Sequence, residues 1–165
     1  MSEAKRRYFI REKEVAKLFD DFSEKLNIDL RQLFGAKSKV EVSEMKNATI
    51  FLVNQRPLLA IWKKILLPTL LFKEALSLLP KIVVNMGAVP HVCNGADIMA
   101  PGVVRIEKDF RKNDYVVITD ERFDKPLVVA IAYTDSETAR NLEHGKIAKN
   151  MHYIGDELWG KQLKK

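Results

Sequence analysis

Between residues 85 and 103 the sequence contains the residue types best suited to holding a ligand. A Gly-Ala pair occurs twice there, as Gly87-Ala88 and Gly95-Ala96, and a Pro101-Gly102 pair follows. Because these small residues add little side-chain bulk, backbone N–H groups among them can approach a phosphate or a base closely. A single glycine is more typical of a turn, but the whole spaced pattern is difficult to obtain by chance and suits a segment that holds an anion.

The same segment is predicted to fold around one short helix. Gly87 follows an apolar run and is predicted to end a strand, whereas Pro90 is suited to begin a helix because it lacks an N–H. Asn94 and Gly95 are predicted to end that helix through a left-handed residue. Since the N-terminus of a helix favours negative charge, an anion-binding turn is expected between the two Gly-Ala pairs.

The histidines and the cysteine do not form a pattern typical of a metal site. His91 and Cys93 are two residues apart, and His144 and His152 are eight apart. The sequence has no Cys-x-x-Cys and no His-x-x-x-His pair, so we expect neither a metal nor another cofactor. His91 is better explained as an exposed polar contact and Cys93 as a small buried residue.

Catalytic motifs are missing as well. The sequence has neither a Gly-x-Ser-x-Gly elbow nor a Gly-x-x-x-x-Gly-Lys phosphate loop, and the carboxylates at Asp120, Glu121 and Asp124 are typical of a solvated turn. We therefore expect a protein that is not an enzyme. Cys93 is the only cysteine, which fits a reducing compartment and predicts a cytoplasmic location.

The net charge of +6 suggests an anionic partner, but the charge is unevenly distributed. Residues 1–80 hold 15 Lys and Arg against 10 Asp and Glu, whereas residues 81–165 hold 13 against 12. Lys63 and Lys64 follow an apolar run and are suited to a phosphate contact, although a solvated edge explains them equally well. The charge therefore directs a nucleic-acid hypothesis to the N-terminal half.

The N-terminal half is predicted to be a small α/β domain. Apolar residues recur with helical spacing from 11 to 26, and the turn residues at 54–57 indicate a hairpin. Pro68 is predicted to begin a second helix that ends near Leu79, and Pro80 marks the boundary between two domains that share an interface. The predicted strands are 7–10, 39–45, 49–53 and 58–62.

The C-terminal half is predicted to be a small closed or nearly closed β structure. One helix interrupts it, beginning with the capping pattern of 134–137 and ending at Gly145. A membrane span is not expected, because the longest uncharged apolar run, 65–72, is far shorter than the roughly 20 residues needed. The predicted strands are 82–84, 97–99, 103–106, 115–119 and 127–133.

On these residues the C-terminal half resembles a PUA domain, the RNA-binding pseudobarrel of pseudouridine synthases and archaeosine transglycosylases. The similarity is closer to the malignant-T-cell-amplified-sequence family and the related initiation factor ligatin, and it runs from about residue 40 to the C-terminus. It implies an α+β fold, in which a small N-terminal α/β domain (1–80) packs on a PUA pseudobarrel (81–165). The matching residues are Val40–Val42, the hairpin around Asn54, Pro68-Thr69-Leu70, Gly87-Ala88, Gly95–Met99, Pro101-Gly102, Gly145, Asn150, His152-Tyr153, Asp156 and Leu158-Trp159.

The resemblance implies RNA binding through the glycine-bordered helix, the following strand and the last strand. In eukaryotic members it also implies docking on the small ribosomal subunit near initiator tRNA, together with a density-regulated partner protein. The nearly neutral C-terminal half departs from PUA domains that clamp tRNA with many basic residues, so we expect the basic N-terminal domain to share the contact. The RNA surface is carried over to Gly87, Ala88, His91, Asn94, Gly95, Ala96, Asp97, Lys146, Asn150 and His152.

Two functions from different classes remain open for a chain that we expect to be a monomer. The first is an RNA-binding adaptor that contacts tRNA or small-subunit ribosomal RNA during initiation or recycling. The second is a protein-interaction module that docks a partner translation factor and has little RNA affinity of its own. A steep salt dependence of RNA binding would favour the first function, because phosphate contacts release counterions. Salt-insensitive binding to a protein would favour the second.

Overall fold

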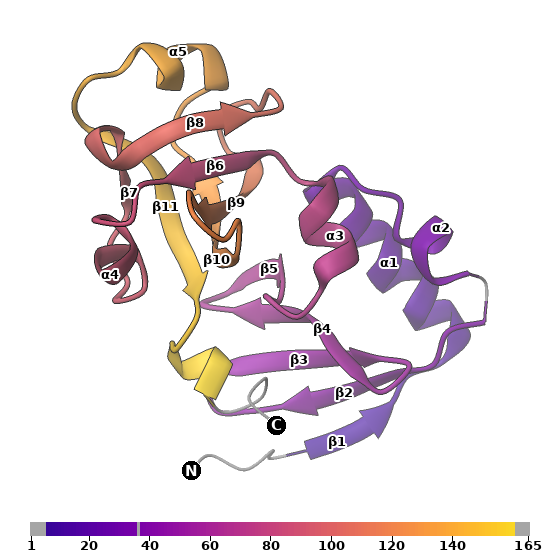
Figure 1. Cartoon of the computed structure of the whole chain (residues 1–165). Helices are drawn as coiled ribbons and strands as arrows, with labels where there is room; N and C mark the ends of the chain where they lie inside the picture. Colours follow the sequence, from indigo (N-terminus) through magenta and orange to yellow (C-terminus); the bar gives the residue numbers. More distant parts are fainter. Residues whose placement is uncertain (1–5, 36, 161–165) are drawn as a thin grey trace.

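Two sheets, one from each half of the chain, make up the computed structural model, which describes residues 6–35 and 37–160 (Figure 1). The N-terminal sheet is an antiparallel meander in which each strand pairs with the next one along the chain. Its strands are β1 (Arg6–Phe9), β2 (Val40–Glu44), β3 (Ala48–Val53), β4 (Arg56–Trp62) and β5 (Ile65–Pro68).

Two helices join β1 to β2. The predicted amphipathic helix is α1 (Glu12–Leu26), whose apolar face buries Val15, Phe19 and Phe22 in the core of the N-terminal half. It is followed by α2 (Leu30–Phe34), which begins where the Asp29 carboxylate accepts a hydrogen bond from the Gln32 N–H. The sequence did not predict α2, because five residues are too few to establish a helical period.

The predicted hairpin forms, but it is tighter than expected. Asn54 and Gln55 both have positive φ, so they make a two-residue turn, and Arg56 and Pro57 already belong to β4. Lys63 and Lys64 also have positive φ and make a second turn of this kind between β4 and β5. Two short hairpins therefore set the register of this part of the sheet.

The prediction that Pro68 begins a helix is wrong. Pro68 ends β5 and lies opposite Leu59 of β4, while the helix α3 begins later and spans Lys73–Leu78. The strand position is compatible with proline because β5 is the edge of its sheet, where a missing N–H leaves no ladder hydrogen bond unmade. The sequence did not predict the turn at Lys63 and Lys64, after which the chain runs back as β5 and reaches Pro68.

The C-terminal sheet is strongly curled and has six strands in the order β7-β11-β10-β9-β6-β8. Only β6 and β9 run parallel, and the end strands β7 and β8 are not paired with each other. This half is therefore a pseudobarrel rather than a closed barrel, which confirms the predicted α+β fold class. Its strands are β6 (Lys81–Val84), β7 (Ile98–Met99), β8 (Val103–Glu107), β9 (Tyr115–Asp120), β10 (Pro126–Ala132) and β11 (Lys146–Tyr153).

The helix predicted before β11 forms with a different cap. In α5 (Ser136–Asn141) the N-cap is Asp135, whose carboxylate accepts a hydrogen bond from the Thr138 N–H. The predicted capping box would have placed the N-cap one residue earlier, at Thr134. The helix also ends before Gly145. That glycine has a φ of +97° and leads into β11, and its carbonyl accepts a hydrogen bond from Ala100.

One apolar cluster extends across the two sheets. It combines Leu67 and Leu70 of the N-terminal half with Val117, Val129 and Met151 of the pseudobarrel. The two halves therefore bury a common core and are not joined by an open linker.

Two hydrogen bonds join the halves at the same junction. The N–H of Leu70 donates to Nε2 of His152 over 3.2 Å, and the hydroxyl of Tyr115 donates to the carbonyl of Leu66. A third bond, of 2.8 Å from Nδ1 of His152 to the Asp156 carboxylate, lies within the C-terminal half and holds the ring in place. Because these polar groups are wholly or partly enclosed, the first two bonds fix one half against the other.

We expect Tyr115→Phe to weaken this junction without opening a cavity. Loss of the hydrogen bond to Leu66 should lower the free energy of unfolding by about 1 kcal/mol at neutral pH. Burial raises the pKa of Tyr115 to about 12 from its ordinary value of 10.0. The tyrosine therefore stabilises the fold fully below pH 10, and this contribution is lost as the pH rises through 12.

Urea unfolding of both proteins across that alkaline range measures the difference. The variant should lose less stability than the wild type as the pH rises, because its ring cannot ionise. Identical pH profiles would contradict the assignment of Tyr115 to the junction.

Candidate nucleic-acid interface

The helix between the two Gly-Ala pairs forms as predicted. It is α4 (Val89–Val92), with Pro90 in its first turn, and Gly95 in the turn that follows has a φ of +96°. Just before the helix, Oδ1 of Asn85 accepts a hydrogen bond of 2.9 Å from the N–H of Ala88. Because α4 has only one turn, its dipole can supply only a small part of any attraction for an anion.

A shallow pocket of about 460 Å³ lies against this helix. It is bounded by α4, the end of β6, β7 and a turn of 3-10 helix, Ala100–Gly102. Most of the lining side chains are small or apolar, and several N–H groups around α4 are already bonded within the loop, such as that of Ala88 to Asn85 and that of His91 to Ala88. The lining residues are Val84, Asn85, Gly87, Ala88, His91, Val92, Ala96, Asp97, Ile98, Met99, Pro101 and Gly102.

Two glycines are needed for the close packing around this pocket. A Cβ atom on Gly102 would lie 3.0 Å from the Cβ of Ala88, so the two walls can approach each other only if one residue has no side chain. Gly95 is in the left-handed region, and a Cβ atom there would lie 3.3 Å from the ring of Tyr153. Larger residues at these positions would change the shape of the pocket.

The loop after α4 is held from below by Asn150 of β11. Its Nδ2 donates to the carbonyls of Val92 and Ala96, each over 2.9 Å, and its backbone N–H donates to the Asp97 carboxylate over 3.0 Å. The Asn150 side chain is buried, so it supports the pocket and does not face a ligand. The sequence identified this residue but predicted a direct RNA contact, which the burial corrects.

The carboxylate of Asp97 connects the pocket to β11. It also accepts a hydrogen bond from the Tyr133 hydroxyl over 3.1 Å, and the Lys146 ammonium lies 3.3 Å away. Burial acts to raise the pKa of Asp97, but the Asn150 N–H, Lys146 and Tyr133 together hold it below its ordinary value. An ionised Asp97 therefore keeps the exposed Lys146 beside the pocket at neutral pH.

The structure brings most of the predicted residues together. Asn94 and Gly95 are exposed in the turn after α4, and Lys146 lies opposite Met99 on the strand next to it. Lys63 and Lys64 lie elsewhere, in the exposed turn between β4 and β5 of the N-terminal sheet. The predicted residues that line the pocket itself are Gly87, Ala88, His91, Ala96 and Asp97.

His152 is placed differently from the prediction. Its side chain is 0% exposed, and its two ring nitrogens are bonded to Leu70 and Asp156 at the junction of the two halves. It cannot contact RNA from this position, so we remove it from the candidate interface.

Sequence reasoning did not select Asn85 and Met99, which also line the pocket. The signal for Asn85 was its position before the first Gly-Ala pair, where an Asn side chain commonly bonds the backbone two or three residues later. Met99 gave no comparable signal, because an exposed methionine and a buried one look alike in a short strand.

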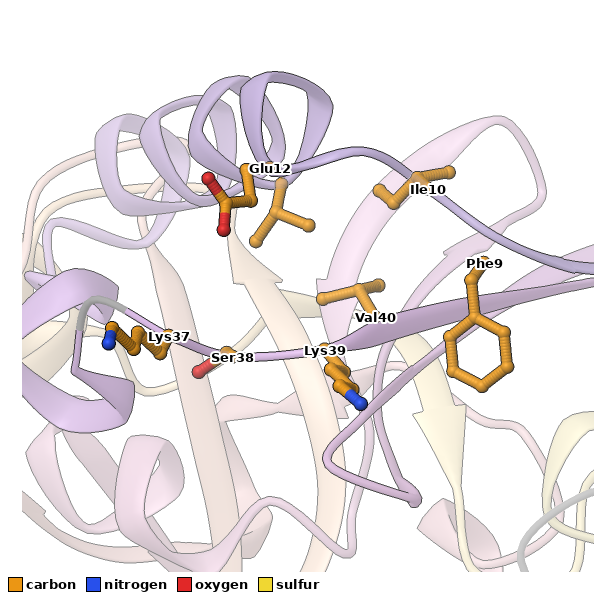
Figure 2. Close-up of a pocket in the computed structure, with 8 residues that line it drawn as sticks. Phe9, Ile10, Glu12, Lys37, Ser38, Lys39 and Val40 are labelled. Carbon is orange, nitrogen blue, oxygen red and sulfur yellow. The ribbon is translucent and has the colours of Figure 1, made fainter.

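A second hollow, of about 510 Å³, lies in the N-terminal half between β1, α1 and the segment that enters β2 (Figure 2). Its apolar lining includes Ile10, Val15 and Val40. Figure 2 shows Glu12 at the start of α1, facing the segment that carries Lys37 and Lys39. The pocket beside α4 remains the better candidate, because it is lined by several of the residues that the sequence selected.

Cys93 and the other possible metal ligands do not form a reactive centre. Burial raises the pKa of the Cys93 thiol, which therefore stays protonated at neutral pH. Within residues 6–35 and 37–160, no three His, Cys, Asp or Glu side chains are grouped as metal ligands. No helix in this part of the chain is long and apolar enough to cross a membrane.

Two protein-family models match the chain, one in each half. The model described as PUA domain matches residues 80–154, and the model described as Domain of unknown function (DUF1947) matches residues 6–73. The first match includes the whole pocket, α4 and β11. The candidate interface thus lies in a PUA domain, which is an RNA-binding domain.

Relatives of known sequence match over different lengths. An uncharacterized protein of Methanocaldococcus jannaschii is 34% identical over 163 residues, which cover 95% of this chain and 97% of that protein. Translation machinery-associated protein 20 of Schizosaccharomyces pombe is 31% identical over 80 residues, 46% of this chain and 44% of its own length. A probable tRNA pseudouridine synthase B of Pyrobaculum islandicum is 37% identical over 87 residues, 53% of this chain and only 25% of that enzyme.

A solved structure supports the same arrangement of both halves. A hypothetical protein of the archaeon Pyrococcus horikoshii has a TM-score of 0.79 and 29% identity, over 94% of this chain and 98% of that one. The Methanocaldococcus protein, too, is matched over nearly all of both chains, so the similarity extends well beyond a single shared domain. In this chain a DUF1947 domain precedes the PUA domain, and part of its length is similar to translation machinery-associated protein 20. The chain therefore belongs to the same family of PUA-domain proteins as the Methanocaldococcus protein.

Proposed function

We propose that this chain is an RNA-binding adaptor of translation that holds tRNA or small-subunit ribosomal RNA in the pocket beside α4. The observation that carries the proposal is the pocket itself, which small residues line on the side of α4 and where His91 stands exposed. Lys146 adds one cation, 3.3 Å from the lining carboxylate of Asp97. Such a surface suits an RNA strand that is recognised by shape and hydrogen bonds, with few phosphate contacts.

The relatives support a role linked to translation. The S. pombe relative is a translation machinery-associated protein, and the Pyrobaculum relative is a probable tRNA pseudouridine synthase. This chain matches only a quarter of that enzyme, so we propose that it shares RNA contact with the enzyme and not its catalytic activity. We therefore propose a cytoplasmic protein without enzymatic activity.

The N-terminal half would supply further phosphate contacts. Its Lys63 and Lys64 are exposed at a tight turn, and Nζ of Lys63 lies 5.7 Å from the ring of Trp62. No ion pair with another described residue occupies either lysine. A free pair of cations at a defined position favours a phosphate ligand.

A second candidate is a protein-interaction module that docks a density-regulated-like partner. The observation that favours it is the near neutrality of residues 81–165, with 13 basic against 12 acidic residues. A neutral surface gives little electrostatic steering toward RNA, whereas protein interfaces need none.

We expect Ala96→Glu to weaken RNA binding strongly. Ala96 is exposed and lines the pocket, so the new carboxylate would face the RNA phosphates and should lower the affinity roughly tenfold. Gly95 is a poorer choice, since its φ of +96° would strain any side chain. Binding to deacylated tRNA and to small ribosomal subunits across a salt series measures the effect.

A matched control is Gln32→Glu on α2, which adds the same charge on an exposed helix of the other half. It should bind like the wild type, and the wild-type affinity should fall as salt rises. If the wild type binds neither RNA nor ribosomes at low salt, direct recognition is excluded and the docking module is favoured.

Asn150→Ala should uncouple the pocket from β11 and so reduce both stability and RNA affinity. Removal of the carboxamide takes one hydrogen bond from the carbonyl of Val92, which keeps the bond from the Gly95 N–H, and one from the carbonyl of Ala96. The two losses together should cost about 1–3 kcal/mol. Hydrogen exchange at Gly95 and Ala96 should rise more than exchange in β3. Unchanged exchange in the loop after α4 would contradict the supporting role of Asn150.

A further inference from the structure

The loop between β9 and β10, Glu121–Lys125, carries an aromatic side chain with no structural task. Phe123 is 71% exposed, more than any other large apolar side chain in the described part of the chain. The guanidinium carbon of Arg122 lies 5.9 Å from the centre of its ring. A single exposed apolar side chain is common on protein surfaces, so the significance of this ring depends on how its loop is held and on what lies beside it.

The backbone of this loop is held firmly from inside. The carboxylate of Asp120 is buried and accepts backbone hydrogen bonds from Arg122, Phe123 and Lys125. Burial acts to raise the pKa of Asp120, but these hydrogen bonds hold it below its ordinary value, so the carboxylate is ionised at neutral pH. Phe123 is therefore presented on a preorganised turn.

The same loop is attached directly to the pocket. The Glu121 carboxylate accepts the N–H of Met86 over 2.7 Å, and the Glu121 N–H donates to the carbonyl of Val84 over 3.0 Å. Val84 lines the pocket, and Met86 immediately precedes the first Gly-Ala pair. Only Arg122 separates Glu121 from Phe123, so this attachment places the residue next to the proposed RNA-binding pocket.

The loop carries two acidic and two basic residues, but both carboxylates already have partners: Glu121 accepts the Met86 N–H, and Asp124 pairs with Lys81. Arg122 and Lys125 are exposed, and neither forms an ion pair with another described residue. Lys125 is close enough to α4 to act on Cys93, where it opposes the rise in thiol pKa that burial causes. An aromatic face flanked by two free cations is the combination that binds a nucleotide through its base and its phosphate.

We propose that Phe123 stacks on an unpaired base of the RNA whose backbone occupies the pocket beside α4. The inference rests on the proposed RNA-binding function and adds a class of ligand to it. Bases inside a duplex have both faces covered, so a single exposed ring selects RNA that carries an unpaired nucleotide next to the bound strand. Arg122 and Lys125 then neutralise the phosphates that flank that nucleotide.

The test uses the full chain and a hairpin RNA with a single-stranded extension, made in 5′- and 3′-extended forms and with a blunt end. Each extension carries 2-aminopurine, whose fluorescence falls when the base stacks. Of the two extended hairpins, the one that the wild type binds more tightly should bind Phe123→Ala roughly 5- to 100-fold more weakly. The variant should also fail to reduce the 2-aminopurine fluorescence. Phe123→Trp should retain both the affinity and the fluorescence change, and binding to the blunt hairpin should be equal for the three proteins.

Phe9→Ala is the matched control, because Phe9 is also a phenylalanine with an exposed side chain, 65% accessible, but lies on the edge strand of the other sheet. It should leave RNA binding unchanged. If the wild type and Phe123→Ala bind the extended hairpins equally while Ala96→Glu loses binding, the stacking proposal is overturned and the proposed function stands. If the wild type binds none of the three RNAs, both are overturned.

Discussion

The candidate interface depends on one buried carboxamide. The carbonyls of Val92 and Ala96 lie on either side of the left-handed turn at Gly95, and both are bonded to Nδ2 of Asn150 at 2.9 Å. Each such hydrogen bond contributes about 0.5–1.5 kcal/mol, and the carbonyl of Val92 accepts the Gly95 N–H as well, so the backbone is held on the path that brings both groups to one amide. The shape of the pocket is thus determined by a side chain that a ligand does not touch.

β11, the strand that carries this carboxamide, also fixes the two halves of the molecule relative to each other. Two residues beyond Asn150, the buried ring of His152 accepts the Leu70 N–H and donates to Asp156. The common apolar core strengthens this junction further. A displacement of β11 would therefore disturb both the pocket and the position of the N-terminal sheet, which makes the two halves a single platform for a ligand.

Features governed by neighbours in sequence were predictable, and those governed by distant partners were not. The 15 residues of α1 carry a clear helical period, and the glycine-bordered helix follows from local backbone preferences. By contrast, the burial of His152 depends on a partner 82 residues away, and that of Asn150 on one 58 residues away. Family motifs identified both residues, but only the fold distinguishes a supporting side chain from one that faces a ligand.

The distribution of charge explains why a rigid junction matters for binding. The excess of basic residues lies in the N-terminal half, whereas the pocket lies in the nearly neutral half. If a flexible linker joined the two halves, RNA contacts at Lys63 and Lys64 would be independent of contacts at α4. Their binding free energies would then combine only after the entropic cost of ordering the linker. Because the bonds of His152 and Tyr115 fix the two halves, an RNA bound as we propose would meet both surfaces without that cost. Shape recognition at the pocket and charge at a distance would then be parts of one binding surface.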